Sequence, residues 1–169
     1  RWPTKNWPLP YMAKLCEDLS LEDIRVVITG TEKDSGRADT LMNMVKNAKP
    51  INACAKTGVS QLASLIKKCS VYISPDSASL HVAAAMGVPF IALFGPTDYR
   101  RHLHPAKDYI LMNKDLLCSP CYKTKCKLGS MGIYERVNLT KMEVELPKSF
   151  SSSISFLAFS AKNLVLMFG

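Results

Sequence analysis

Short apolar segments typical of buried strands alternate along this chain with segments whose apolar residues recur at helical spacing. The strand-like segments cover residues 24–29, 50–54, 70–74 and 88–94, and the helical segments cover residues 9–19, 39–48, 60–69 and 79–86. Strands that are apolar along their whole length are buried on both faces, which in α/β proteins is achieved by helices on both sides of a parallel sheet. The sequence therefore predicts an α/β fold: a Rossmann-like parallel sheet with helices on both faces.

The length and composition fit one packed domain. The chain has 169 residues, of which 47% are hydrophobic and 21% charged. This composition can build a core and excludes a disordered tail or a low-complexity linker. The chain begins at Arg1 without a secretory signal, and this abrupt start predicts a fragment of a longer protein. The longest apolar stretch, residues 154–168, is interrupted by Lys162 and is too short for a transmembrane helix.

The charge of the chain is positive and uneven. The net charge is +8, which predicts an anionic partner such as a phosphate-bearing substrate, a membrane surface or nucleic acid. Residues 99–127 hold seven Lys or Arg against two Asp. This basic segment is either a solvated face or a surface for anionic lipid or a phosphorylated acceptor. No nucleic-acid-binding motif accompanies it, so nucleic acid is not the expected partner.

The cysteines fall into two groups. Three of them lie in apolar segments and are expected to act as small buried hydrophobes: Cys16, Cys54 and Cys69. The other three follow the spacing Cys-x2-Cys-x4-Cys and are Cys118, Cys121 and Cys126. Three thiols at this spacing are weak candidates for zinc ligands, because a zinc site needs a fourth. We therefore expect a structural role in a surface loop, with no bound metal and no cofactor.

The strongest candidate site follows the strand at residues 70–74. Ligands of open parallel sheets bind beyond the carboxyl ends of the strands. Ser77 or Ser79 can cap the next helix, and the N–H groups at its start can bind a phosphate. Asp76 would repel a phosphate, so we expect it to hold the loop by hydrogen bonds or to bind a hydroxyl. His81 is placed to donate to a phosphate or a sugar. The alternative is that Asp76 and Ser77 only cap the helix and His81 is a satisfied core residue.

Two further loops are expected at the same edge of the sheet. Asp34 follows the strand at residues 24–29, where carboxylates commonly bind ribose hydroxyls; the alternative is a solvated, acidic helix start. The turn at residues 95–98 fixes the backbone at the mouth of the same cleft. The sequence contains no G-x-G-x-x-G, no P-loop and no G-x-S-x-G, which argues against a dinucleotide-dependent dehydrogenase, a P-loop NTPase and an α/β-hydrolase.

A family resemblance rests on four stretches. Residues 74–98, SPDSASLHVAAAMGVPFIALFGPTD, closely resemble the signature of glycosyltransferase family 9, the ADP-heptose:lipopolysaccharide heptosyltransferases. RWPTKNWP at residues 1–8 looks like the family's segment ending in Lys-x-Trp-Pro, and AKTGVSQL at residues 55–62 is similar to its Gly-Lys-Thr-Ser-Leu-x-Glu-Leu stretch. The three later cysteines resemble a cluster of the heptosyltransferase II-like branch. The likeness covers residues 1–128, in order.

The resemblance implies a GT-B architecture of two Rossmann-like domains, in which residues 1–146 form the C-terminal, donor-binding domain. Residues 147–169 are expected to be a divergent tail of unknown role. The implied reaction transfers heptose from ADP-heptose to the lipopolysaccharide inner core with inversion. The implied base lies in the N-terminal domain, so no catalytic residue is assigned, and the fragment alone is expected to bind donor weakly and transfer nothing.

The resemblance also implies partners and a location. The partners are the ADP-heptose donor, the lipid A–core acceptor and the chain's own N-terminal domain. The location is cytoplasmic, with peripheral contact at the inner face of the inner membrane. Two alternatives stay open: a non-catalytic nucleotide-binding module, and a GT-B transferase that uses another nucleotide sugar.

Site residues are carried over by position. Lys5 matches the family's lysine on the donor phosphates, Asp34 a carboxylate near the nucleoside, and Thr57 a position lining the base pocket. The residues matching the loop around the diphosphate and heptose are Asp76, Ser77, Ala78 and His81. The chain departs from the family where Ala78 replaces Gly, where Asp34 replaces Glu, and where a fourth Cys is missing after Gly129.

Overall fold

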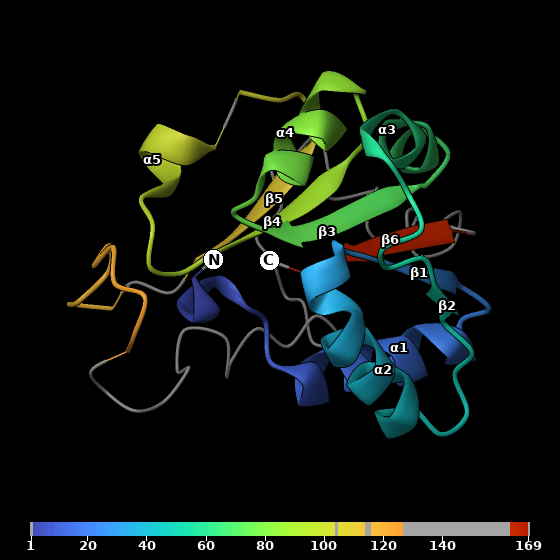
Figure 1. Ribbon diagram of the computed structural model, residues 1–169. Helices are drawn as coiled ribbons and strands as arrows, with labels where there is room; N and C mark the ends of the chain where they lie inside the picture. The colour runs from blue at the N-terminus through green and yellow to red at the C-terminus, as the bar shows by residue number, and fades with distance from the viewer. Residues whose placement is uncertain (1, 104, 114–115, 127–162, 169) are drawn as a thin grey trace.

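The parallel sheet predicted from the sequence is present. The structure, a computed structural model, describes residues 2–103, 105–113, 116–126 and 163–168. Its strands form one sheet in the order β2-β1-β6-β3-β4-β5, with every pair parallel (Figure 1). The strands are β1 (Arg25–Thr29), β2 (Ile51–Asn52), β3 (Val71–Pro75), β4 (Phe90–Phe94), β5 (Tyr109–Asn113) and β6 (Asn163–Met167). Because they are parallel, their carboxyl ends meet at one edge.

Helices cover both faces of this sheet, which confirms the predicted fold class. On one face lie α1 (Leu9–Leu21) and α2 (Ser35–Met44) (Figure 1). On the other lie α3 (Val59–Lys67) and α4 (Ala78–Ala85), with the short α5 (Tyr99–His102) beside α4. Two 3₁₀ turns, η1 (Pro3–Lys5) and η2 (Glu32–Asp34), precede α1 and α2. Along the described residues, no helix has both the length and the apolar character needed to span a membrane.

The two faces of the sheet have separate hydrophobic cores. Successive side chains of a strand point to opposite faces, so one strand serves both cores. In β3, Ile73 packs in the core beneath α1 and α2, whereas Tyr72 packs in the core beneath α3 and α4. In β6, Leu164 and Leu166 join the first core and Val165 the second. Strands buried on both sides explain the continuous apolar runs in the sequence.

The last described strand comes from the segment predicted to be a tail of unknown role. β6 lies between β1 and β3 and pairs with both. Leu164, Val165 and Leu166 are at most 6% exposed. The apolar end of the chain therefore supplies a central strand of the same sheet. The boundary predicted at residue 146 lies outside the described residues.

Several element bounds differ from the prediction. The helix expected over residues 39–48 begins at Ser35, directly after η2, whose Thr31 and Asp34 form a capping box. It ends at Met44, since Val45 has an extended backbone. The elements α5 and β5 were not predicted, because the basic residues around the apolar run at 109–112 masked its strand character.

Candidate functional site

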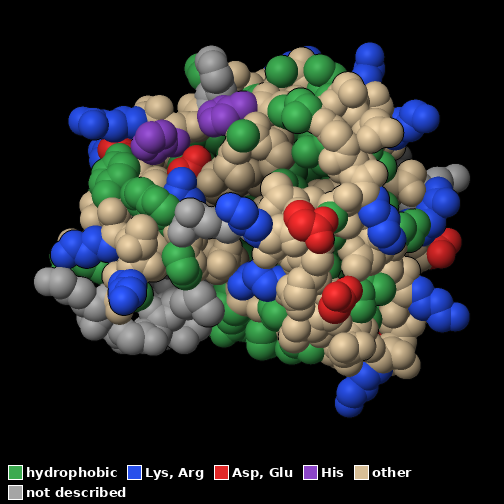
Figure 2. Space-filling model, in the orientation of Figure 1, with side chains coloured by type: hydrophobic (Ala, Val, Ile, Leu, Met, Phe, Trp, Pro, Cys, Tyr) green, Lys and Arg blue, Asp and Glu red, His purple; other side chains and the backbone are tan. Residues whose placement is uncertain are grey.

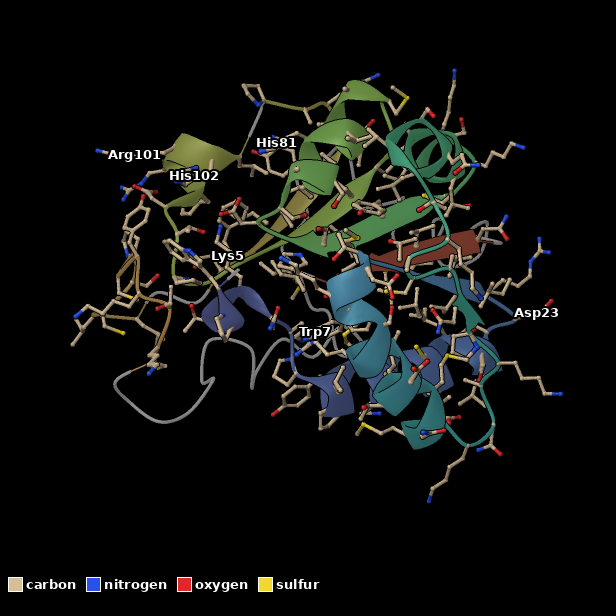
Figure 3. The ribbon with its side chains drawn as sticks, viewed as in Figure 1. Lys5, Trp7, Asp23, His81, Arg101 and His102 are labelled. Carbon is tan, nitrogen blue, oxygen red and sulfur yellow. The ribbon has the colours of Figure 1, made fainter. Side chains whose placement is uncertain are left out.

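Most of the predicted site residues lie at or beside the carboxyl edge of the sheet. Asp76 and Ser77 directly follow β3, and the turn at residues 95–98 follows the neighbouring β4. Lys5 reaches this edge from η1, at the other end of the sequence (Figure 3). The structure thus gathers three segments that are far apart in the sequence.

The centre of the site is the carboxylate of Asp76. Lys5 Nζ lies 2.6 Å from Asp76 Oδ2 and 3.5 Å from the Asp76 carbonyl oxygen. Thr97 Oγ1 donates to the same Oδ2 at 2.8 Å. The Asp76 side chain is 9% exposed and that of Lys5 is 23% exposed, so solvent screens this ion pair only in part. Asp76 therefore holds the loop after β3 by hydrogen bonds, which is one of the two roles expected for it.

Local structure fixes the approach of Lys5. Pro3 at the start of η1 has a backbone preset for a helical turn, and the Lys5 amide donates to the Trp2 carbonyl at 3.0 Å. The Lys5 ammonium also lies 5.1 Å from the centre of the Trp2 ring. Trp7 anchors the segment in the core with 4% exposure, and its carbonyl accepts a hydrogen bond from Arg37 at 3.1 Å.

The start of α4 has no side-chain cap. Ser77 occupies the N-cap position, but its hydroxyl pairs with Ser74 and Ser79, each at 2.8 Å, rather than with a first-turn N–H. The predicted serine cap is therefore absent. Ala78, the first helical residue, is exposed. An uncapped and accessible helix start retains backbone donors that an anion can use.

A buried tyrosine lies beneath this serine network. Tyr72 is fully buried, and its hydroxyl has no hydrogen-bond partner among the described residues. Burial raises the pKa of Tyr72, while the nearby hydroxyls of Ser79, Ser74 and Thr29 act in the opposite direction. The group is therefore neutral at physiological pH and can serve the network only as a hydroxyl.

The structure places His81 apart from Lys5 (Figure 3). It is half-buried on α4, and in Figure 3 it is well separated from Lys5 and lies toward α5. Figure 3 shows both His81 and His102 on the side of the molecule where α4 and α5 lie. Its predicted contact with the diphosphate or heptose stays a prediction.

Asp34 is buried, so the alternative of a solvated helix start is wrong for Asp34 itself, although Thr31, Glu32 and Lys33 before it are exposed. Its Oδ2 accepts hydrogen bonds from the Thr31 amide at 2.7 Å and the Thr31 hydroxyl at 2.8 Å. Gly30 permits this packing, because a Cβ there would lie 2.7 Å from Cys54 Sγ and 2.9 Å from Asp34 Cβ. Its nucleoside contact remains a prediction, and Glu32 is the exposed carboxylate of the same turn.

The loop before α3 holds the predicted base-pocket residue. Thr57 is half-buried, and the next amide, that of Gly58, donates to Gln61 Oε1 at 2.9 Å. Ala55, where the family signature has Gly, has a φ of 60°. Most residues avoid this left-handed conformation, so the loop carries local backbone strain.

The six cysteines divide as predicted. Burial raises the pKa of Cys16 to about 12 and that of Cys69 to about 11, and Cys54 is buried too. Cys118 is exposed, and Cys121 and Cys126 are partly buried. Within the residues that the structure covers, no three His, Cys, Asp or Glu side chains gather as a metal site.

The cysteines at 118, 121 and 126 lie on a loop, residues 116–126, that we call the cysteine loop. Ser119 Oγ donates to the Gly95 carbonyl at 2.6 Å, and the Tyr122 amide donates to the Pro96 carbonyl at 2.8 Å. Thr4 Oγ1 donates to the Lys123 carbonyl at 2.6 Å. The loop therefore packs on the two segments that carry Thr97 and Lys5.

The sequence profile of "Glycosyltransferase family 9 (heptosyltransferase)" matches residues 1–131. The chain belongs to glycosyltransferase family 9. This family 9 chain is 33% identical over 102 residues to the lipooligosaccharide heptosyltransferase 2 of Haemophilus influenzae, covering 56% of the chain and 28% of that protein. It is 34% identical over 98 residues to the lipopolysaccharide heptosyltransferase 2 of Escherichia coli, with the same coverage.

Solved structures agree with the family assignment. The E. coli ADP-heptose lipopolysaccharide heptosyltransferase II matches with a TM-score of 0.62 and 28% sequence identity, over 67% of this chain and 35% of that one. The family 9 glycosyltransferase of Veillonella parvula matches with a TM-score of 0.61 and 25% identity, over 68% and 33%. The family 9 chain thus spans about a third of the length of these proteins.

Proposed function

We propose that this chain is the donor-binding part of a glycosyltransferase that transfers heptose from ADP-heptose to the lipopolysaccharide inner core. The observation that carries the proposal is the position of Lys5. Its ammonium is bound to Asp76, two residues before the uncapped start of α4. A cation beside a helix N-terminus favours the binding of a diphosphate without any metal.

The proposed reaction inverts the anomeric carbon of the heptose. An acceptor hydroxyl oxygen forms the new bond to that carbon, and the bond from the carbon to the diphosphate oxygen breaks. The bonding electrons leave with ADP, and the hydroxyl proton passes to a base that we assign to another domain. Lys5 and the N–H groups of α4 stabilise the negative charge that develops on the departing diphosphate.

Asp76 is compatible with an anionic ligand because it is paired. Its Oδ2 accepts from both Lys5 and Thr97, which compensates the charge that would otherwise repel a phosphate. We propose that Asp76 holds Lys5 beside the donor. Ala78 and Ser77 are proposed to face the diphosphate, Asp34 and Thr57 the nucleoside, and His81 the heptose.

Nucleotide titrations test this function. Isothermal calorimetry with ADP, GDP and UDP on the folded chain is expected to give the tightest binding for ADP. A preference for GDP or UDP would favour a transferase with another donor, and the absence of ADP binding would overturn the proposal. Binding of ADP without heptose transfer by the longer protein that contains this chain would favour the non-catalytic module.

We further propose that the enzyme works in the cytoplasm and contacts the inner face of the inner membrane, where its lipid-anchored acceptor lies. Exposed basic side chains lie on α5 and the cysteine loop: Arg100, Arg101, Lys123 and Lys125 (Figure 2). Leu117 on the cysteine loop is fully exposed. Cations around an exposed apolar side chain suit an anionic lipid surface.

Vesicle flotation tests the membrane contact. The chain is expected to float with vesicles of phosphatidylglycerol and phosphatidylethanolamine, and to float less at high salt or with the variant Leu117→Asp. Equal flotation with neutral phosphatidylcholine vesicles, or binding that salt does not change, would contradict an electrostatic contact.

A further inference from the structure

The cysteine loop touches both groups that bind the Asp76 carboxylate. Lys5 and Thr97 bind the same oxygen, Oδ2, from opposite parts of the sequence. The residue before Lys5 is Thr4, whose hydroxyl donates to the loop at the Lys123 carbonyl. The two residues before Thr97 are Gly95 and Pro96, whose carbonyls accept hydrogen bonds from the loop. The cysteine loop therefore connects the two segments that carry Lys5 and Thr97, the two residues that bind Asp76 Oδ2.

We infer that Thr4 and Thr97 are positioning residues for Lys5, and that the cysteine loop is the brace through which Thr4 acts. Thr97 orients the Asp76 carboxylate that receives the ammonium, and Thr4 fixes η1 so that Lys5 reaches it. The inference rests on the proposed function for its ligand, and on contacts within this chain for its geometry.

Burial strengthens the hold that the hydroxyls of Thr4 and Thr97 have on their segments. Thr4 is 8% exposed and Thr97 is 4% exposed. A hydroxyl away from water that loses its acceptor is costly, so each hydrogen bond restricts its segment more than a solvated bond would. The 2.6 Å bond from Thr4 joins residues separated by 119 positions in the sequence, so it fixes tertiary rather than local structure.

The backbone of the cysteine loop is also constrained. Tyr122 has a φ of 52° in the left-handed region, and its amide is held by Pro96. Its hydroxyl accepts from the Asp98 amide at 3.3 Å, and its ring makes an edge contact with His102. Such a backbone conformation persists when its surroundings hold it in place. These contacts set the loop against the turn at residues 95–98 and leave the Lys123 carbonyl in position for Thr4.

Covalent labelling of Lys5 tests the geometry without any ligand. Acetylation by an N-hydroxysuccinimide ester, followed by mass spectrometry, reports how readily the ammonium leaves Asp76. Thr4→Val and Thr97→Val are each expected to raise the acetylation rate of Lys5 about fivefold, the effect of one lost hydrogen bond. Thr4→Ser and Thr97→Ser keep the hydroxyl and should restore the wild-type rate. Thr124→Val, an exposed change on the same loop, is the matched control.

Ligand affinity gives the second readout. Thr4→Val and Thr97→Val are expected to weaken ADP about fivefold and to leave adenosine, which lacks the diphosphate, unchanged. Equal loss of ADP and adenosine affinity would mean a general structural role and overturn the inference. Lys5 acetylation rates equal to that of Thr124→Val would overturn it as well. If circular dichroism shows that Thr4→Val does not fold, Ser119→Ala on the cysteine loop replaces it. The same increase in Lys5 acetylation and the same loss of ADP affinity are then expected.

The acetylation and affinity measurements distinguish this inference from the proposed function. A wild-type chain that binds no ADP contradicts the proposed function, whereas the acetylation rates still decide whether the threonines position Lys5.

Discussion

The ammonium of Lys5 and the carboxylate of Asp76 are bound at 2.6 Å although 71 positions separate them in the sequence. Lys5 arrives on a 3₁₀ turn before the first helix, and Asp76 follows a central strand. The pair brings a cation to the start of α4, where backbone N–H groups lack a side-chain cap. The proposed anion site at this edge depends on this pair more than on the fold.

A double-mutant cycle measures that relationship. The variants Lys5→Met, Asp76→Asn and their combination are expected to show a coupling free energy of about 1–2 kcal/mol in urea unfolding, because the pair is only partly solvated. Lys14 and Asp18, an exposed pair one helical turn apart, are the control, with an expected coupling of about 0.3–0.5 kcal/mol. A coupling for Lys5 and Asp76 no larger than the control would show that the ion pair contributes little.

Backbone conformation predicts opposite effects at two sites. Ala55 and Gly87 have φ values of 60° and 67°, so Ala55→Gly is expected to stabilise the chain by about 0.5–1 kcal/mol and Gly87→Ala to destabilise it by about 1 kcal/mol. A Cβ at Gly87 would meet no atom within 4 Å, so its effect is conformational alone. Gly36→Ala, in α2 with equal space, should stabilise by up to about 1 kcal/mol. The three variants are compared by thermal or urea unfolding. A Gly87→Ala variant that is as stable as the wild type, or more stable, would contradict this account.

The carboxylate of Glu17 predicts a pH dependence of stability. It accepts hydrogen bonds from the amides of Lys46, Asn47 and Ala48, which lower its pKa below the ordinary value of 4.5. Because the pKa is lowered in the folded state, the stabilisation is present above pH 4.5 and is lost as the pH falls through the folded-state value. Glu17→Gln should therefore be less stable than the wild type at pH 7, with a smaller difference near pH 3. A difference in urea midpoint that does not shrink on acidification would contradict this assignment.

The burial of β6 predicts that truncating one of its side chains lowers the free energy of unfolding strongly. Leu166 is 1% exposed in β6, so Leu166→Ala is expected to cost about 2–5 kcal/mol of unfolding free energy. Leu117→Ala removes the same atoms from a fully exposed position and should stay within about 0.5 kcal/mol of the wild type. If the two variants were equally stable, β6 would not be a central strand of the sheet in solution.

Local patterns explain what could be predicted. Helical spacing and continuous apolar runs fixed the alternation of strands and helices, and the parallel sheet then placed Asp76 and Ser77 at one edge. The position of β6 depends on pairing with β1 and β3, from Arg25↔Asn163 to Val71↔Leu164, and no local window contains such distant pairs. The apolar run at 164–166 signalled only that the segment needed a packing partner.

Side-chain partners in the site were harder to predict than its location. The repulsion between Asp76 and a phosphate was foreseen, but not the pairing with Lys5 and Thr97 that compensates it. The burial of Asp34 against Thr31 was not predicted either, and its contact with a nucleoside stays a prediction. Hydrogen bonds between distant segments depend on how loops pack, and composition and spacing carry little information about that.

The most direct test of the donor-site proposal is the affinity of ADP for the wild-type chain and for Lys5→Met, measured by calorimetry, with Lys14→Met as a control for charge. A lost charge-assisted contact corresponds to a 10- to 100-fold effect, roughly. The account predicts that Lys5→Met weakens ADP by at least about tenfold and that Lys14→Met binds like the wild type. Equal ADP affinity for the wild type and Lys5→Met, with both folded, would contradict the placement of the diphosphate beside Lys5.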